Sequence, residues 1–387
     1  MRADRMRVVH ITTVPESLVS YLRGQIDFLR ERGIDVIAVS SPGHHLDAFA
    51  REFSADVVAV EMPRKITPLR DLRSLASLVK TLRAQHPQII HAHTPKGGLL
   101  GMIGGWLAGV PVRIYHMRGL PLETATGWRR ALLTATERTS CALATRVLCV
   151  SSSLREVALR EHLVDPGKIE VLANGSGQGV DATGKFDPAR LPPDARAATR
   201  KRHGIPDDAV VLGYFGRLVR DKGILELLGA WQTLRDAYPK LHLILAGVIE
   251  ERDALPPGAL AALRGDDRIH LLGFDWNTPP LYAAMDIVVL PTYREGFPNV
   301  PLEAAAMTRP VVATRVSGCV DAIVDGVTGL LVPPRDADAL AAALRRYIDD
   351  PALRARHGTA ARERVLLSFR REILWEAIHQ TYLELTA

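Results

Sequence analysis

The chain has 387 residues, enough for two globular domains, and its 47% hydrophobic and 24% charged residues exclude a largely disordered protein. The net charge of +6 is concentrated in residues 1–190 and suggests an anionic partner, but no helix-turn-helix, zinc finger or aromatic-basic RNA motif points to nucleic acid. Three widely spaced cysteines, Cys141, Cys149 and Cys319, favour a reducing compartment and argue against a structural zinc site.

Strand and helix patterns alternate through the first half. The start of the chain lacks the apolar core of a signal peptide and is predicted to be the first strand of a cytosolic protein. Leucines at three- and four-residue spacing, from Leu69 to Leu82, predict a helix whose apolar face lies in the core. Strands are expected at 7–14, 34–41, 88–94, 112–119, 146–152 and 168–175, with helices at 18–33 and 66–86 and a buried helix within 97–112.

The pattern breaks at residues 181–208, where Pro, Gly and Asp accumulate and predict a linker. A second β-α series begins at 209–218, and a helix is expected at 336–348. The chain is therefore predicted to be α/β, with two doubly wound Rossmann-like domains, 1–190 and 191–368, that face an interdomain cleft, and a terminal helix in 369–387. Parallel sheets bind ligands at the carboxyl ends of their strands, so the site is expected there.

Two carboxylates flank a turn in "REGFPNVPLEAAAM". Glu295 follows a predicted strand, the next helix is expected to begin near Val300, and Glu303 is placed in its first turn. Free amides at a helix start favour a diphosphate, and each carboxylate suits a vicinal diol, so the pair matches the two ends of a nucleotide-sugar. Taken alone, Glu303 is better explained as a complement to the helix dipole and Glu295 as a solvated loop charge.

Two cations follow the first strand of the second half, in "GYFGRLVRDKGI". Arg217 and Lys222 lie in the turn before a helix that is expected to begin near Ile224. Cations at such a turn neutralise a diphosphate leaving group, although an exposed basic turn is a common alternative.

Together these stretches, with "RPVVATRVSGCVDAIVDGVTGLLVPPRDADAL", resemble the retaining glycosyltransferases of family 4, which have the GT-B fold. The resemblance implies that Arg217 and Lys222 contact the donor diphosphate, Glu303 the ribose, Glu295 the donor sugar, and His116 the transferred sugar and acceptor. It places Phe297, Pro298 and Asn299 beside that sugar, although Pro298 has no N–H to donate. It implies front-side attack without a cofactor or metal, and packing of helix 370–384 on the first domain. Closure of the two domains about 181–208 is a separate hypothesis, because hinge motion commonly excludes water from a cleft. The first loop lacks the family's glycines, so a phosphate contact there depends on side chains such as Ser17.

The first half, in "ITPLRDLRSL", "HAHTPKGGLLG", "YHMRGL" and "GSGQGVD", is similar to a subgroup that builds bacterial surface polysaccharides on undecaprenyl-diphosphate. This implies a UDP- or GDP-sugar donor, a lipid-diphosphate-linked saccharide acceptor, and a peripheral position on the inner face of the cell membrane. A basic stripe is expected to guide the acceptor and dock on anionic lipid, although a solvated face is the usual meaning of such a stripe. Its residues are Arg64, Lys65, Arg70, Arg73 and Lys80, with Lys96 as a further phosphate contact.

Several alternatives accompany this interpretation. A nicotinamide-dependent dehydrogenase is disfavoured because no strand precedes a G-x-G-x-x-G pattern, whereas a sugar-nucleotide epimerase and a non-catalytic nucleotide-sugar-binding scaffold stay open. Asp336 and Asp338 are better explained by N-capping than by a metal. His91 and His93 are interpreted as structural strand-end residues rather than proton carriers. Trp128 is equally consistent with a lipid contact and with packing on its own domain.

Overall fold

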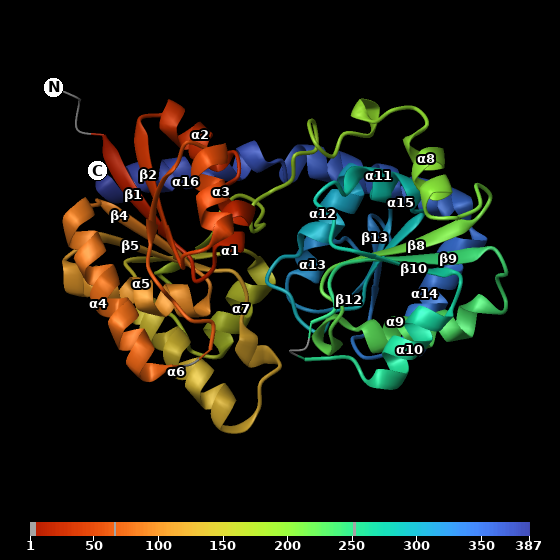
Figure 1. Ribbon diagram of the computed structural model, residues 1–387, viewed down its shortest axis with the longest axis horizontal. Coiled ribbons are helices and arrows are strands. Elements are labelled where there is room, and N and C mark those ends of the chain that lie inside the picture. Colours follow the sequence, from red (N-terminus) through yellow and green to blue (C-terminus); the bar gives the residue numbers. More distant parts are fainter. Residues whose placement is uncertain (1–4, 66, 251–252) are drawn as a thin grey trace. The chain divides into compact units, whose positions relative to one another are not determined.

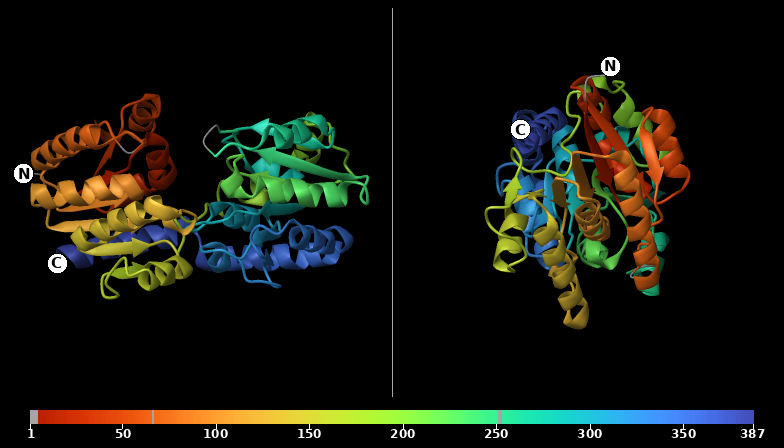
Figure 2. Two further views of the ribbon diagram at one scale, coloured as in Figure 1. Left: turned by 90° about the horizontal axis from the view of Figure 1, so that it is seen from below. Right: turned by 90° about the vertical axis from the view of Figure 1, so that its left-hand side faces the viewer.

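A computed structural model describes residues 5–65, 67–250 and 253–387, which form two compact units. Unit 1 comprises Met1–Gln178 with Glu372–Ala387, and unit 2 comprises Gly179–Arg371. Each unit has one parallel sheet with helices on both faces (Figures 1 and 2). The predicted fold class, two doubly wound Rossmann-like domains, is confirmed.

The sheet of unit 1 has the order β3-β2-β1-β4-β5-β6-β7, and all neighbouring strands are parallel. The order reverses between β1 and β4, which is the point where doubly wound sheets open a crevice for ligands. The strands are β1 (Met6–Ile11), β2 (Ile34–Ser40), β3 (Asp56–Ala59), β4 (Ile89–His93), β5 (Val112–Met117), β6 (Arg146–Cys149) and β7 (Ile169–Val171). Six were predicted, and the short, partly exposed β3 was not.

Helices cover both faces of this sheet. The single helix predicted at 18–33 is wrong: Gly24, with a φ of 77°, separates α1 from α2, because this left-handed conformation ends one helix and redirects the chain. The helices are α1 (Pro15–Leu22), α2 (Gln25–Glu31), α3 (His44–Glu52), α4 (Pro68–Gln85), α5 (Pro95–Ala108), η1 (Pro121–Glu123), α6 (Gly127–Leu143), α7 (Ser152–Arg160) and α16 (Arg371–Thr386).

The last helix, α16, lies against the helices and strands of unit 1 (Figure 1). Its Leu374, Ile378 and Tyr382 are buried in one apolar core with residues of β1, β2, α1 and α2. The Trp375 and Phe28 rings approach to 5.6 Å between centroids, which joins α16 to α2. The final segment of the chain therefore completes the core of the first unit.

The predicted core face of α4 is wrong in its first half. Leu78 and Leu82 are buried, but Leu69 and Leu72 are 81% and 65% exposed. A spacing of three residues falls short of the 3.6-residue helical turn, so successive leucines rotate around the helix, and Leu69 ends up on the side opposite Leu78. The buried face is continued instead by Ser74, whose hydroxyl donates to the Arg70 carbonyl at 2.9 Å.

Unit 2 has the sheet order β10-β9-β8-β11-β12-β13, again parallel throughout, with its reversal between β8 and β11. Figure 1 shows α9, α10 and α14 on one face of the sheet and α11, α12 and α15 on the other. The strands are β8 (Val210–Phe215), β9 (Leu241–Ala246), β10 (Ile269–Gly273), β11 (Ile287–Leu290), β12 (Val311–Thr314) and β13 (Gly329–Val332). The helices are η2 (Pro188–Arg190), α8 (Ala195–Arg202), η3 (Arg220–Lys222), α9 (Ile224–Arg235), α10 (Pro257–Gly265), α11 (Pro279–Ala284), α12 (Asn299–Ala306), α13 (Cys319–Ala322), α14 (Ala337–Asp349) and α15 (Pro351–Ser368). Asp336 caps α14 by accepting from the Ala339 N–H at 2.8 Å, which confirms the capping prediction.

The linker predicted at 181–208 is an ordered part of unit 2. Within it, α8 is fixed by Arg196 and the buried Arg200, which donate to the Asp286 carboxylate at 2.7 and 2.8 Å. Upstream, Val180 pairs with Arg370, so residues 179–190 also lie with unit 2 rather than with the first domain. The composition was misleading because α8 is charged along its length and its contacts are made by arginines rather than by an apolar face.

Candidate active site

The predicted donor-site residues of unit 2 gather at the β8–β11 reversal. Arg217 and Lys222 follow β8, and Glu295 follows β11, so all three lie at the carboxyl ends of adjacent strands. Lys222 Nζ and Glu295 Oε1 form an ion pair. The two side chains are only 20% and 15% exposed, so this pair is better shielded from solvent than an ordinary surface salt bridge.

The backbone brings these two loops together at Gly223. This residue has a φ of 70°, and a Cβ placed on it would lie 1.8 Å from the Pro291 carbonyl oxygen at the end of β11. Only glycine permits both the conformation and the approach. Gly223 therefore sets the distance between the Lys222 turn and the Glu295 loop.

The turn after Glu295 leads directly into α12, which begins at Asn299 with Pro298 as its N-cap residue. Phe297 and Pro298 are buried, and no described side chain caps the helix. Amides at this helix start favour an anion. The side-chain Oδ1 of Asn299 is buried and has no hydrogen-bond partner in the described structure, so this oxygen can still accept a hydrogen bond.

Glu303 lies just past the first turn of α12 rather than in it, because the helix begins at Asn299, one residue earlier than predicted. The Tyr282 hydroxyl of α11 donates to Glu303 Oε2 at 2.8 Å. Burial raises the pKa of Glu303, and the Tyr282 hydrogen bond opposes that shift. The helix dipole acts weakly at this position, whereas the contact with Tyr282 shows Glu303 as a hydrogen-bond acceptor.

Arg217 is more exposed than Lys222. Its guanidinium contacts Glu250 at 3.0 Å, and the two side chains are 46% and 30% exposed. The contact is a solvated ion pair that an incoming anion can replace at little cost.

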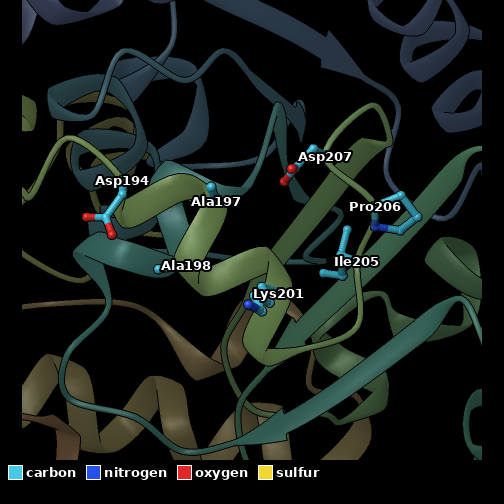
Figure 3. Close-up of a pocket in the computed structure, with 7 residues that line it drawn as sticks. All are labelled: Asp194, Ala197, Ala198, Lys201, Ile205, Pro206 and Asp207. Carbon is cyan, nitrogen blue, oxygen red and sulfur yellow. The ribbon is translucent and has the colours of Figure 1, made fainter.

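A pocket elsewhere in unit 2 is not part of this site. It is lined by residues of α8 and of the turn before β8, among them Lys201, Pro206 and Asp207 (Figure 3). These residues precede β8, whereas Arg217 and Lys222 follow it, so the pocket lies toward the opposite edge of the sheet.

In unit 1, His116 lies inside β5, and it is only 2% exposed. It belongs to a cluster of four buried histidines on three central strands: His10 on β1, His91 and His93 on β4, and His116 on β5. Burial and the nearby Arg118 charge lower the pKa of His10 to about 3. Burial likewise holds the pKa values of His91, His93 and His116 well below their usual range, so all four rings are neutral at physiological pH.

Three of these rings offer nitrogens within 4.8 Å of one another, a spacing that suits a metal ion. The surroundings of these three nitrogens do not fit a metal ion. Arg118 Nε donates to His93 Nδ1 at 3.1 Å, and its charge disfavours a cation beside it. His10 Nδ1 and His93 Nε2 lie 3.0 Å apart in a hydrogen bond with each other, so neither lone pair is available to a metal.

Comparison with known proteins identifies the chain. Residues 195–364 match the family described as glycosyl transferases group 1, and residues 3–175 match the glycosyl transferase 4-like domain. A capsular polysaccharide biosynthesis glycosyltransferase, CapM of Staphylococcus aureus, is 33% identical over 97% of this chain and 96% of its own. The chain belongs to the glycosyltransferases.

Other relatives of this glycosyltransferase also transfer sugars, and they give no support to the epimerase alternative. UDP-Gal:alpha-D-GlcNAc-diphosphoundecaprenol alpha-1,3-galactosyltransferase of Escherichia coli is 29% identical over 80% of this chain and 78% of its own. Among solved structures, Anabaena HepE in complex with UDP and glucose matches with a TM-score of 0.82 at 21% identity, covering 98% of this chain and 100% of that one. Sucrose-phosphate synthase from Thermosynechococcus elongatus matches with a TM-score of 0.80 at 23% identity, covering 98% and 99%. These structures establish the GT-B class of fold.

The predicted acceptor-side cations of the glycosyltransferase differ from one another in their surroundings. Lys96 is not free: it pairs with Asp71 at 2.6 Å and donates to the carbonyls of Pro63 and Lys65 at 2.5 and 2.6 Å, which ties α5 to the loop before α4. The remaining residues of the stripe are all exposed: Arg64, Lys65, Arg70, Arg73 and Lys80. Trp128 is also exposed, at 77%, so its side chain is not packed into its own domain. Within the described residues, no helix combines the length and apolar character needed to cross a bilayer.

The sequence interpretation missed three residues of the histidine cluster's hydrogen-bond network, His10, Arg118 and Tyr382. Arg118 stood within the quoted "YHMRGL" stretch, two residues after His116, and that proximity was an available signal. Tyr382 lies on α16, and its hydroxyl contacts His91 Nδ1 at 2.6 Å. A separation of 291 residues hides this contact from any local pattern.

Proposed function

We propose that this glycosyltransferase moves a sugar, with retention of anomeric configuration and without a metal, from a UDP- or GDP-sugar to a lipid-diphosphate-linked saccharide. The observation that carries the proposal is the shielded Lys222–Glu295 pair at the β8–β11 reversal, which places a cation and a polyol acceptor side by side. The named Escherichia coli relative, which uses UDP-Gal and a diphosphoundecaprenol-linked acceptor, supports the same donor and acceptor classes.

On the donor side, Lys222 and Arg217 would neutralise the two phosphates, and the start of α12 would add backbone donors from Phe297 and Asn299. Glu303 would accept the ribose hydroxyls, and Tyr282 would hold its carboxylate in place. Glu295 would accept hydroxyls of the transferred sugar. Each of these contacts belongs to unit 2, so recognition of the nucleotide is a property of that unit.

In the transfer step, the bond between the anomeric carbon and the phosphate oxygen breaks as the acceptor hydroxyl attacks the same face. The leaving diphosphate takes the hydroxyl proton, so no protein base is consumed. Charge builds on the diphosphate, and preorganised donors there are the main contribution of the enzyme. His116 of unit 1 would contact the transferred sugar and the acceptor.

We further propose a peripheral position on an anionic membrane surface through the first part of α4. Leu69 and Leu72 are exposed on the same outer face of the helix as Arg73 and Lys80. Exposed leucines among cations suit an interface that offers both acyl chains and anionic headgroups. Lys96 would act there indirectly, by fixing the loop that carries Arg64 and Lys65.

The test is incubation of the purified enzyme with UDP- and GDP-sugars and a polyprenyl-diphosphate-linked saccharide, followed by mass analysis of the lipid and NMR of the new anomeric centre. We expect one added sugar, retained configuration and the same rate in excess chelator. Free sugar or an epimerised nucleotide-sugar, without lipid product, would contradict transfer. A chelator-sensitive rate would contradict the metal-free scheme alone.

A further inference from the structure

Six side chains of unit 1 form a closed ring of hydrogen bonds. Arg118 Nε donates to His93 Nδ1 at 3.1 Å, His93 Nε2 lies 3.0 Å from His10 Nδ1, and His10 Nε2 lies 3.2 Å from the Tyr382 hydroxyl. The Tyr382 hydroxyl lies 2.6 Å from His91 Nδ1, and His91 Nε2 lies 3.0 Å from His116 Nδ1. Arg118 closes the ring, because its second terminal nitrogen lies 3.5 Å from His116 Nδ1.

One fixed donor determines every proton in this ring. A guanidinium only donates, so His93 Nδ1 must accept, and the single proton of the neutral His93 ring must be on Nε2. That proton is donated to His10 Nδ1, which puts the His10 proton on Nε2, directed at the Tyr382 oxygen. The Tyr382 O–H then donates to His91 Nδ1, and His91 Nε2–H donates to His116 Nδ1.

Tracing the ring from its other end, the contact between Arg118 and His116, assigns the same tautomers. Arg118 also donates toward His116 Nδ1, which must therefore accept and be donated to by His91 Nε2–H. Arg118 donates to both His93 and His116, so the tautomers assigned from these two contacts agree with each other. The result is that all four rings are protonated on Nε2.

Among the described residues, every ring nitrogen of the four histidines has a partner in this ring except His116 Nε2. We propose that the ring locks His116 in the neutral Nε2–H tautomer and orients that N–H as a hydrogen-bond donor for a sugar oxygen. In this arrangement Arg118, Tyr382, His91, His10 and His93 are positioning residues. The sugar contact rests on the proposed function, whereas the tautomer does not.

Other roles for the ring fit less well. A proton relay needs a group at its end that releases a proton, and Arg118 stays charged although burial lowers its pKa to about 10. Arg118 is also held in place, since it stacks 3.7 Å over the Tyr21 ring and donates to the Gly177 carbonyl. A metal would need nitrogen lone pairs that the ring already uses.

The test is long-range proton–nitrogen NMR of the whole chain labelled with ¹⁵N-histidine. Spectra of single His→Gln variants assign the four buried rings. We expect Nδ1 of each to be unprotonated and Nε2 to carry the proton, with no change when zinc is added. His116 protonated on Nδ1, an imidazolium among the four, or zinc-induced shifts would overturn the ring. This measurement on the wild-type protein suffices even where a variant fails to fold.

The functional part is tested with Tyr382→Phe, which removes the one hydroxyl between His10 and His91. We expect His91, whose Nδ1 loses its donor, to become a tautomer mixture that no longer holds the His116 ring in one orientation, while Arg118 keeps His116 Nδ1 unprotonated. We expect kcat to fall about tenfold, the effect of losing roughly 1.4 kcal/mol, with UDP affinity unchanged. The matched control is Tyr347→Phe, whose hydroxyl contacts His357 Nδ1 at 2.8 Å in unit 2. A His91 tautomer unaffected by Tyr382→Phe would overturn the ring. Mixed tautomers with normal kcat would overturn the sugar contact of His116 and leave donor binding by unit 2 standing.

Discussion

Lys222 and Glu295 form an ion pair between the ends of the two strands at which the sheet of unit 2 reverses its order. The pair holds a cation and a carboxylate, each with a separate role in the proposed reaction, in one fixed geometry. Because neither side chain is more than a fifth exposed, replacing one leaves the other with little water to compensate.

Lys222→Met is therefore expected to lower kcat about 100-fold, since one preorganised donor to a developing charge is worth roughly 3 kcal/mol.

Glu295→Gln should reduce turnover much more than UDP affinity, because it removes a contact to the sugar and not to the nucleotide. Steady-state kinetics with calorimetric UDP binding separates the two effects. The control is Lys240→Met, which breaks an exposed pair with Asp208 near the opposite edge of the sheet. Equal losses of turnover and UDP affinity in Glu295→Gln would place that carboxylate elsewhere.

Glu303→Ala is expected to abolish the rise in melting temperature that a nucleoside diphosphate produces, because the ribose loses its acceptor. The ligand-free variant should melt somewhat lower than the wild type, because the buried Tyr282 hydroxyl also loses its acceptor. A thermal-shift panel of UDP, GDP and ADP measures this and also identifies the base. Tyr282→Phe, which keeps the carboxylate, should retain a reduced shift. An undiminished shift in Glu303→Ala would be incompatible with the assigned role.

For the membrane surface, Leu69→Ser with Leu72→Ser should weaken binding to anionic vesicles at least about tenfold without lowering stability, because both side chains are already exposed. Replacing Arg70, Arg73 and Lys80 by glutamine should weaken binding as well, and that loss should disappear at high salt. Leu367→Ser, at a 78% exposed leucine of α15, is the control. Unchanged vesicle sedimentation in both variants would make the stripe only a solvated face.

Gly223→Ala tests the backbone contact that sets the site. Gly204 has a similar φ of 68° but no atom within 4 Å of a Cβ placed on it, whereas the Cβ of Gly223 would meet the Pro291 oxygen. Gly204→Ala should therefore cost only the strain of the left-handed conformation, about 1 kcal/mol. Gly223→Ala should cost clearly more in the free energy of unfolding and should also lower UDP affinity. Equal costs in denaturant titrations would show that the loops are not held together there.

A pH effect on stability is expected from Glu137 of α6. Burial raises its pKa to about 7, and the Tyr115 hydroxyl donates to it at 2.7 Å. The unfolded group titrates near 4.5, so between that pH and about 7 the unfolded state releases its proton while the folded state keeps it. Stability should fall as pH rises through this window and level off above it. In Glu137→Gln this fall should be smaller by about 3 kcal/mol in urea titrations at pH 5 and pH 8. Parallel curves for both proteins would contradict the shift.

Sequence reasoning succeeded where local rules dominate. Buried strands such as β8 and β11 appear as short apolar runs, and the residues that follow them, Lys222 and Glu295, were predictable as neighbours because parallel strands end at a common edge. It failed where tertiary contacts decide. The exposure of Leu69 depends on which face of α4 meets α5, and the partner of Glu303 is supplied by another helix. Composition also concealed α8, whose Arg196 and buried Arg200 are fixed by the Asp286 carboxylate.

The return of α16 to unit 1 has a consequence for how the protein is made. Leu374, Ile378 and Tyr382 belong to the core of unit 1, and all other residues of that unit have been synthesised once Gln178 is added to the chain. Domains ordinarily fold in the order of synthesis. Here the nascent first unit must wait, with an apolar surface open and without the Tyr382 hydroxyl between His10 and His91, while the whole of unit 2 is translated. Unit 1 is therefore synthesised first but completes its fold last. During that interval it is the part of the chain most in need of a chaperone.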